Sequence, residues 1–388
     1  MSQFSKPTKF LRVCFVHDWL VTMRGGEKVL EALVELFPNA PIYTLFMNRD
    51  SLSNVLKKRT IYTSFLQVIP GVAQIYRCLL PIFPLAVRSL RTKNYDLVIS
   101  SSHCVAKAVK VRKDAFHICY CHTPMRYLWG FSEEYFGKFP LFLRKIIEFY
   151  FNFLKKWDIQ TSRRVNLFIA NSQNTAKKIQ KLYGKVAKVI YPPVDIPPDQ
   201  IEQKSHNGEY YLIVGALVPY KKLGLAIEAF NRLNRPLKIV GDGPIRKKLE
   251  RLVRSKKIQF ERWVDNDKLW TLYLNAKALI FPGEEDFGIV PVEAQMLGKP
   301  VIAFGKGGVR ETVVAYNHEH AGSSESESTG IFFYEANPNS LIECVLKSEA
   351  LKFNAEFIKS HARRFTRDRF QQEIKKCLDG LAYEETFH

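Results

Sequence analysis

Blocks of apolar residues alternate along the chain with segments in which apolar residues recur every three or four positions. Leu11–His17 is a short apolar run, and the segment behind it has apolar residues at helical spacing as far as Leu36. The same order returns later, with a helix predicted at Leu223–Leu233 and strands predicted at Tyr210–Gly215 and Leu237–Val240. Strands that alternate with helices in this way predict parallel sheets. We therefore expect an α/β protein.

A polar, proline-rich stretch at 196–209 has the composition of a linker. It divides the chain into predicted domains at residues 1–192 and 193–365, followed by a terminal helical part at residues 366–388. Phe357–Leu378 has the pattern of the terminal helix. With 388 residues and 46% hydrophobic residues, the chain is long and apolar enough for two cores. No apolar run approaches the roughly 18 to 20 residues that span a bilayer, and the N-terminus has no apolar signal region. The chain is expected in the cytoplasm.

The stretch from Ala278 to Thr312 carries the clearest chemistry. A buried strand is predicted to end at Phe281, an acidic loop follows, and Pro291 stands where a first helical residue would, which places Glu293 in the first turn. Carboxyl ends of strands bind ligands in open α/β sheets. A helix start attracts a diphosphate and carboxylates accept hydrogen bonds from sugar hydroxyls, so the unit suits a nucleotide sugar. Acids that only stabilise the helix dipole are the alternative.

Positive charge is concentrated in the first half. Residues 1–190 hold 30 Lys and Arg against 11 Asp and Glu, a net +19 out of a total of +20. Such a field attracts nucleic acid, anionic lipid or phosphate-bearing substrates. The seven cysteines are scattered, and the Cys-Tyr-Cys-His string at 119–122 has no second pair at metal-ligand spacing. Buried reduced thiols are the better interpretation.

Two further stretches have two interpretations each. Residues 61–93 mix bulky apolar residues, prolines and arginines, which fits a basic segment in a membrane interface or proline-broken helices packed on a core. Residues 138–164 have basic and aromatic residues in a helical pattern, which we interpret as core with a charged outer face. His122 ends a predicted strand on the ligand side, although a single histidine is more often structural. Gly25-Gly26 form a turn that lets backbone approach a ligand or simply turns the chain.

Several of these strings together resemble one known family. They are Glu285 and Glu293 with Phe287-Gly288 between them, Gly298-Lys299-Pro300-Val301-Ile302, and Gly307-Gly308. They resemble the donor-binding signature of retaining glycosyltransferases of the GT-B fold, family 4. The string HTPMRYLW at 122–129 is similar to a bacterial branch of mannosyltransferases that build O-antigen and exopolysaccharide repeats. The resemblance covers nearly the whole chain, from Arg12 to about Leu378.

The resemblance implies two Rossmann-like domains facing across a cleft, with the acceptor on the first and the nucleotide-sugar donor on the second. The helix in 366–388 would return toward the first domain. His122 and Glu285 would be catalytic by positioning the sugar, Arg126 would bind the donor, and Glu293 would hold the ribose. The other expected donor-binding residues are Gly25, Gly26, Lys221, Lys222, Phe287, Gly288, Ile289 and Val290.

By resemblance, the enzyme transfers a hexose, with mannose from GDP-mannose expected, to a polyprenyl-diphosphate-linked glycan or another acceptor. No cofactor is expected, and no divalent metal, since no DxD-type motif stands at a strand end. An anionic membrane surface is the expected partner of the basic first domain, which would place the protein peripherally on the inner face of the membrane. Nucleic acid is not expected, because it would leave the Glu, Gly and His placements unexplained.

One position departs from the family pattern. Ala216 stands where the family has an arginine that grips phosphate, and Lys222 or Arg310 could compensate. Three alternatives therefore stay open: an enzyme that uses a UDP-sugar, a nucleotide-sugar epimerase of the same fold, and an inactive protein that binds glycans or lipids.

Overall fold

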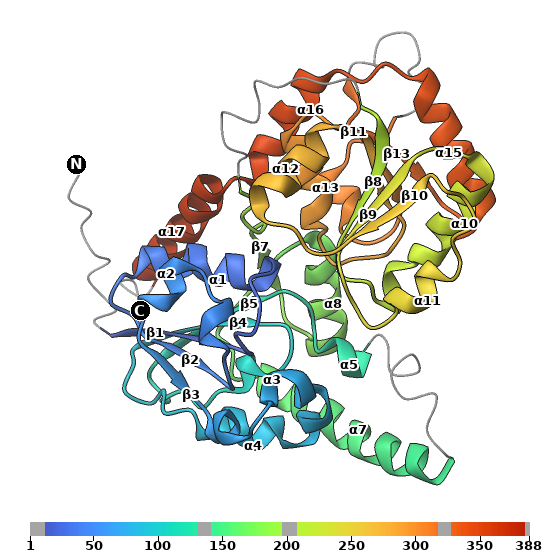
Figure 1. The fold of residues 1–388 in the computed structure, drawn as a ribbon. Helices are drawn as coiled ribbons and strands as arrows, with labels where there is room; N and C mark the ends of the chain where they lie inside the picture. Colours follow the sequence, from blue (N-terminus) through green and yellow to red (C-terminus); the bar gives the residue numbers. More distant parts are fainter. Residues whose placement is uncertain (1–11, 130–140, 196–207, 317–326, 385–388) are drawn as a thin grey trace. The chain divides into compact units, whose positions relative to one another are not determined.

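The computed structural model describes residues 12–129, 141–195, 208–316 and 327–384. The chain divides into two compact units (Figure 1). The first contains Met1–Pro193 and Arg367–His388, and the second contains Val194–Thr366. Each unit is a parallel sheet covered by helices, so the α/β fold expected from the sequence is confirmed. The predicted linker at 196–209 lies outside the described residues except for its last two positions.

Within the described residues, the first unit has one seven-stranded parallel sheet in the order β3-β2-β1-β4-β5-β6-β7. Its central strands are almost fully buried, as strands covered on both faces are. Three apolar clusters pack on its faces, over the described residues. The strands are β1 (Val13–His17), β2 (Ile42–Thr44), β3 (Ile61–Thr63), β4 (Leu97–Ser102), β5 (Phe116–Cys121), β6 (Leu167–Ala170) and β7 (Ala187–Val189).

The helices of the first unit pack on this sheet, and the last of them comes from the end of the chain. Arg367 of α17 donates to Glu31 and Glu35 of α1 at 3.0 and 2.8 Å, so the two helices lie side by side (Figure 1). The helices are α1 (Gly25–Leu36), α2 (Asn54–Lys57), α3 (Val72–Ile75), α4 (Phe83–Ser89), α5 (Arg126–Trp129), α7 (Leu141–Ser162), α8 (Gln173–Tyr183) and α17 (Arg367–Glu384), with 3-10 turns at Arg49–Ser51, Phe65–Val68, Tyr76–Ile82 (η3) and Ala106–Ala108 (η4).

The second unit has a six-stranded parallel sheet, over its described residues, in the order β10-β9-β8-β11-β12-β13. Two apolar clusters pack on its faces. The strands are β8 (Tyr210–Val214), β9 (Leu237–Val240), β10 (Ile258–Glu261), β11 (Ala276–Phe281), β12 (Val301–Phe304) and β13 (Gly330–Phe333). The helices are α10 (Leu223–Leu233), α11 (Arg246–Glu250), α12 (Asn266–Leu274), α13 (Ile289–Met296), α14 (Val309–Thr312), α15 (Pro338–Ala350) and α16 (Ala355–Ala362), with 3-10 turns at Pro219–Lys221 and Arg363–Phe365.

Residues 61–93 form β3 and then short helical turns, because Pro70, Pro81 and Pro84 interrupt any longer helix, which agrees with the interpretation of proline-broken helices packed on a core. One sequence-based expectation needs correction. The helix expected over Phe357–Leu378 is broken at Thr366, which is extended. The backbone N–H of Val194 donates to the carbonyl of Phe365 at 2.8 Å, and this pairing stops the helix where the chain leaves the second unit.

Helix α7 also differs from expectation. Leu154 and Trp157 are buried as predicted, but Phe149 and Phe153 are 79% and 54% exposed, so its outer face is partly aromatic. Over the described parts of the chain, none of the helices combines the length and hydrophobicity required for a membrane span.

Candidate functional site

In the second unit, a lysine and a glutamate meet where the loops after β8 and β11 come together. Lys221 ends the 3-10 turn that follows β8, and Glu285 lies in the loop after β11. Nζ of Lys221 lies 2.8 Å from Oε1 of Glu285, with side chains 13% and 22% exposed. The two strands are neighbours, so the pair lies at the carboxyl edge of the sheet, where ligands of such sheets bind. The structure thus brings two predicted site residues together.

Glycines allow the backbone to fold closely around this ion pair. A Cβ on Gly215 would lie 2.5 Å from Nζ of Lys221, and one on Gly283 would lie 2.7 Å from the Cα of that lysine. A Cβ on Gly307 would clash with the carbonyl of Glu285. Side chains at these three positions would displace the lysine or the acidic loop, so the close approach itself requires glycine.

Helix α13 starts earlier than predicted. It begins at Ile289, so Pro291 is its third residue, and Glu293 lies beyond the first turn. The reason is Gly288, whose φ of +92° turns the chain into the helix two residues sooner. Proline is tolerated at the third position because first-turn N–H groups have no intrahelical acceptor.

The carboxylate of Glu293 is held by a tyrosine that the sequence did not single out. Glu293 is 7% exposed, and its Oε2 accepts a hydrogen bond of 2.8 Å from the hydroxyl of Tyr273 on α12. Burial, with the charge of Glu293, raises the pKa of the Tyr273 hydroxyl well above its usual range, so the tyrosine stays a donor. The tyrosine thereby fixes the orientation of the carboxylate.

The four residues predicted to face a diphosphate lie at the start of α13. Gly288 is the N-cap, and Ile289 and Val290 are the first two helical residues, so their N–H groups belong to the helix end that favours an anion. The side chain of Phe287 is buried, with its ring centre 5.6 Å from that of Phe365. Phe287 therefore anchors the loop through its side chain.

Lys222 is directed differently from Lys221. Its backbone is left-handed, with φ of +51°, and its Nζ lies 4.6 Å from the ring centre of Phe304 at the end of β12. Nζ of Lys306 lies 5.5 Å from the same ring. The carboxyl edge of this sheet therefore carries two further cations beside the ion pair.

In the first unit, three imidazoles gather at the carboxyl edge of the sheet. His17 ends β1, His103 follows β4 and His122 follows β5, and their ring centres lie 6.0 to 6.5 Å apart. A Cβ on Gly26 would lie 3.7 Å from Nε2 of His122 and 3.7 Å from Cε1 of His17. Gly26 and the predicted histidine therefore meet, and a side chain at Gly26 would stand in ordinary van der Waals contact with both rings.

The segment after β4 is fixed by one buried carboxylate. The backbone N–H groups of His103, Cys104, Val105 and Ala106 donate to Asp18 at 2.6 to 2.9 Å. Asp18 follows His17 directly and is fully buried. Buried backbone donors need such partners, so Asp18 sets the path of the loop that carries His103.

Gly25 and Gly26, predicted as a turn, are the first two residues of α1, and a buried glutamate caps that helix. Oε2 of Glu27 accepts from the backbone N–H of Arg24 at 3.1 Å. Burial raises the pKa of Glu27 to about 7, against the lowering effect of its hydrogen bonds. The start of α1 is thereby tied to a carboxyl group that titrates near neutrality.

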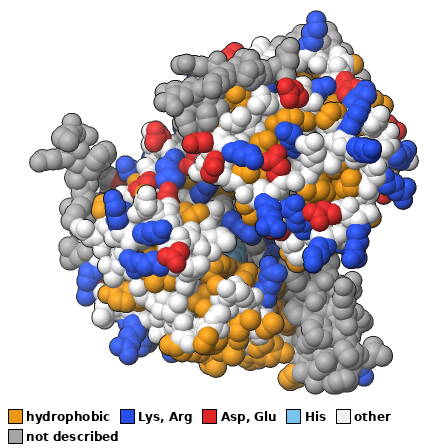
Figure 2. All heavy atoms as spheres, in the orientation of Figure 1, with side chains coloured by type: hydrophobic (Ala, Val, Ile, Leu, Met, Phe, Trp, Pro, Cys, Tyr) orange, Lys and Arg blue, Asp and Glu red, His pale blue; other side chains and the backbone are white. Residues whose placement is uncertain are grey.

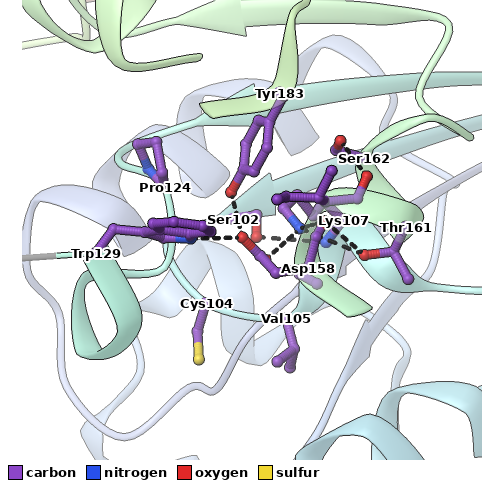
Figure 3. Close-up of polar contacts among 12 residues, drawn as sticks. Ser102, Cys104, Val105, Lys107, Pro124, Trp129, Asp158, Thr161, Ser162 and Tyr183 are labelled. Carbon is purple, nitrogen blue, oxygen red and sulfur yellow. Dashed lines mark hydrogen bonds and ion pairs between the residues drawn. The ribbon is translucent and has the colours of Figure 1, made fainter. Parts of the chain in front are cut away.

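Arg126 begins the short helix α5, whose last residue, Trp129, is anchored in a buried polar network. In Figure 3 Trp129, Tyr183 and Lys107 all point at the carboxylate of Asp158, at 2.9, 2.7 and 2.6 Å. Lys107 and Asp158 are almost completely buried. Arg126 lies close enough to His103 for its charge to add to the effect of burial, and together they lower the pKa of His103 to about 4.

Four site residues were missed by sequence reasoning: His17, Asp18, Ser101 and Tyr273. The first three stand at or just after the carboxyl ends of β1 and β4, and this position was the available signal. Tyr273 gave no such signal, because in the sequence it resembles any residue on the apolar face of a helix. Among the residues that the structure describes, no three His, Cys, Asp or Glu side chains come together as metal ligands.

Comparison with known proteins first defines the class. The crystal structure of Anabaena Alr3699/HepE in complex with UDP and glucose superposes with a TM-score of 0.67 over 95% of this chain and 99% of that one, at 18% identity. The fold is therefore the two-domain α/β fold of glycosyltransferases. Residues 24–196 match "Glycosyltransferase Family 4" and residues 198–364 match "Glycosyl transferases group 1". The chain belongs to the glycosyltransferases of family 4 type.

Curated relatives are distant. The uncharacterized glycosyltransferase MJ1178 of Methanocaldococcus jannaschii is 28% identical over 46% of this chain and 50% of that protein. The alpha-1,3/1,6-mannosyltransferase ALG2 of Saccharomyces cerevisiae is 24% identical over 61% of this chain and 55% of that protein. The chain thus spans about half the length of these two relatives.

Proposed function

We propose that this chain is a retaining glycosyltransferase that transfers a hexose, mannose from GDP-mannose, to a lipid-linked or cell-surface polysaccharide acceptor. The observation that carries the proposal is the Lys221–Glu285 pair beside the start of α13. A cation and a helix start favour a diphosphate, and the carboxylates of Glu285 and Glu293 suit sugar and ribose hydroxyls. The choice of mannose is supported by the name of the ALG2 relative.

In the proposed reaction, the acceptor hydroxyl oxygen bonds to the anomeric carbon while the bond from that carbon to the diphosphate breaks. The hydroxyl proton passes to the departing diphosphate on the same face. Lys221, Lys222 and the amides of Ile289 and Val290 stabilise the negative charge on the diphosphate. His122 and Arg126 contact the transferred sugar and the donor, and no divalent cation takes part.

The second candidate is an inactive binding protein, and Ala216 is the residue that favours it. This residue stands two positions after the end of β8 and has no group that could bind phosphate. Lys222 and Lys306, both next to Phe304, supply positive charge at the end of β12, which is separated from β8 by β11. We therefore propose that lysines replace the missing arginine, at the cost of its bidentate geometry.

The test is calorimetric titration of the metal-free protein with GDP, UDP and GDP-mannose. We expect saturable binding with GDP preferred, and a roughly tenfold or greater loss of affinity in Lys221→Met and Glu293→Gln. Lys359→Met is the matched control, since it removes a lysine paired with Glu356 on α16. Preference for UDP would keep the class and discard mannose, whereas no binding of any of the three nucleotides would make the inactive protein the leading candidate.

We also propose that the first unit binds an anionic membrane surface. Figure 2 shows hydrophobic side chains gathered over α3 and α4. The Tyr150 hydroxyl donates to the carbonyl of Pro81 at 2.6 Å and so brings the exposed aromatic face of α7 beside η3. The exposed apolar residues of this surface are Phe65, Val68, Ile75, Ile82, Leu85, Phe149 and Phe153, and the exposed basic residues near them in the chain are Arg77, Arg88, Arg91 and Lys93.

Liposome sedimentation tests this surface. Val68→Glu with Leu85→Glu should weaken binding to anionic vesicles about tenfold or more, because two exposed apolar side chains no longer enter the interface. Val186→Glu is the control, since Val186 is 85% exposed but follows α8, away from this surface. Equal binding by the unmodified protein, the double variant and the control, or binding that needs no anionic lipid, would contradict the proposed contact with an anionic membrane surface.

A further inference from the structure

A hydrogen-bonded chain of three side chains runs along the carboxyl edge of the first sheet. The hydroxyl oxygen of Ser101 lies 3.1 Å from Nδ1 of His17 and 2.8 Å from Nε2 of His122. Strand pairing creates this arrangement, because β1 and β4 place His17 directly beside Ser101, and the N–H of His122 donates to the carbonyl of Ser102. His17 and Ser101 are buried, at 1% and 0% exposed.

Burial keeps the ring of His17 neutral. Desolvation lowers its pKa to about 3, helped by His103 and His122 and opposed by Asp18. A neutral imidazole carries one N–H, on either Nδ1 or Nε2. Its Nε2 is buried and has no hydrogen-bond partner among the described residues.

The hydroxyl of Ser101 has a single proton, and among the described residues its side-chain partners are the two imidazoles, so it donates to one of them and accepts from the other. In one arrangement, Nδ1–H of His17 donates to Ser101, and Ser101 donates to Nε2 of His122. The isolated Nε2 of His17 is then only an acceptor. In the reverse arrangement that nitrogen carries a buried proton with no acceptor. Buried donors without partners are the rarer and more costly case, so the first arrangement is favoured.

We propose that His17 and Ser101 are positioning residues that hold His122 as the Nδ1–H tautomer. His122 then offers a donor at Nδ1 while its Nε2 is occupied, so it serves as a hydrogen-bond donor to a sugar oxygen and not as a general base. The backbone of His122 is fixed as well, since Asn171 donates to its carbonyl at 2.9 Å. This inference rests on the proposed contact between His122 and the transferred sugar.

The tautomer can be measured without any substrate. Nitrogen NMR of protein labelled at its nine histidines, with His122 assigned by His122→Gln, should show a protonated Nδ1 and an unprotonated Nε2. Ser101→Ala should give a mixture of both tautomers at His122. The opposite tautomer in the unmodified protein, or an unchanged spectrum in Ser101→Ala, would overturn the proposal.

The chain contains a matched control in the adjacent position. Ser100 is equally buried, and its hydroxyl lies 2.8 Å from Nε2 of His117, on the other face of the same strand. Ser100→Ala therefore loses a similar bond and should leave the His122 spectrum and the kcat unchanged. Ser101→Ala should lower kcat about tenfold with little change in donor KM, and Ser101→Thr, which keeps the hydroxyl, should restore part of it.

These outcomes separate the inference from the proposed function. Equal loss of activity in Ser100→Ala and Ser101→Ala would mean a general packing effect and would overturn the positioning role. A Nδ1–H tautomer in a protein that binds no nucleotide would support the hydrogen-bonded chain while the glycosyltransferase proposal fails.

Discussion

Each unit holds a lysine against a carboxylate, and the surroundings of the two pairs differ. Lys107 and Asp158 in the first unit are 2% and 0% exposed, and Trp129 and Tyr183 also donate to the carboxylate. Lys221 and Glu285 in the second unit are 13% and 22% exposed at the edge of the sheet. The first pair is enclosed by protein donors and fixes structure. The second keeps solvent-facing surface, through which a ligand can reach it.

Among the substitutions that test this contrast, Lys107→Met should have the largest effect on stability. It leaves the charge of Asp158 buried without its cation, which costs about 3 to 5 kcal/mol. Lys221→Met should change stability by less than about 1 kcal/mol, because its pair is partly solvated, and should instead weaken nucleotide binding. Urea unfolding, followed by hydrogen exchange resolved to individual peptides, measures the change in stability of both variants. A larger stability loss in Lys221→Met would reverse the assignment of the two pairs.

The glycines at the two edges should respond unequally as well. Gly241 in the second unit has φ of +143°, and a Cβ there would clash with the carbonyl of Gly215, so Gly241→Ala should cost roughly 3 kcal/mol. Gly26→Ala places its Cβ at ordinary contact distance from His17 and His122, so stability should hold while ligand access over these rings falls. Thermal melts and nucleotide titrations of the two variants compare these effects. Equal melting temperatures would contradict the tight packing at Gly241.

Acid should act mainly on the first unit. Burial lowers the pKa of His17 and His117 to about 3 and that of His103 to about 4, whereas the unfolded chain protonates them near 6.5. For these histidines, folded pKa values below the unfolded ones mean stability that is complete above pH 6.5 and is lost as pH falls toward 3 to 4. Asp18 and Glu27, whose pKa values burial raises, act in the opposite direction, and the three imidazoles outnumber them. In the second unit the structure describes one histidine, His361, whose pKa burial also lowers.

Hydrogen exchange at pH 7.5, 6, 5 and 4 should therefore show the first unit losing protection earlier. His117→Gln should reduce that loss, because one group fewer takes up a proton on unfolding. Parallel loss in both units, or no effect of His117→Gln, would show that the buried imidazoles do not set the acid response. Of the three predicted effects on stability, this one is the smallest, and it vanishes at neutral pH.

Local signals were enough for most elements of the fold. The strand at Leu237–Val240 and the helix at Leu223–Leu233 were predicted to the residue, because each depends on apolar periodicity and on nearby breakers. The start of α13 was not, because Gly288 adopts a left-handed conformation that the sequence allows but does not require. The break at Thr366 also escaped, since its cause is a pairing with Val194 far away in the chain.

The sequence by itself determined which residue types stand at the ends of the strands: Glu285, Lys221 and His122 could each be named from motif and position. Only the tertiary structure decided which of them meet. Strand order and register place His17 beside Ser101 and Lys221 against Glu285, and helix packing places Tyr273 against Glu293. The physical reason is that periodicity is a property of neighbours in the chain, whereas hydrogen bonds between strand ends depend on pairings that only the folded sheet creates.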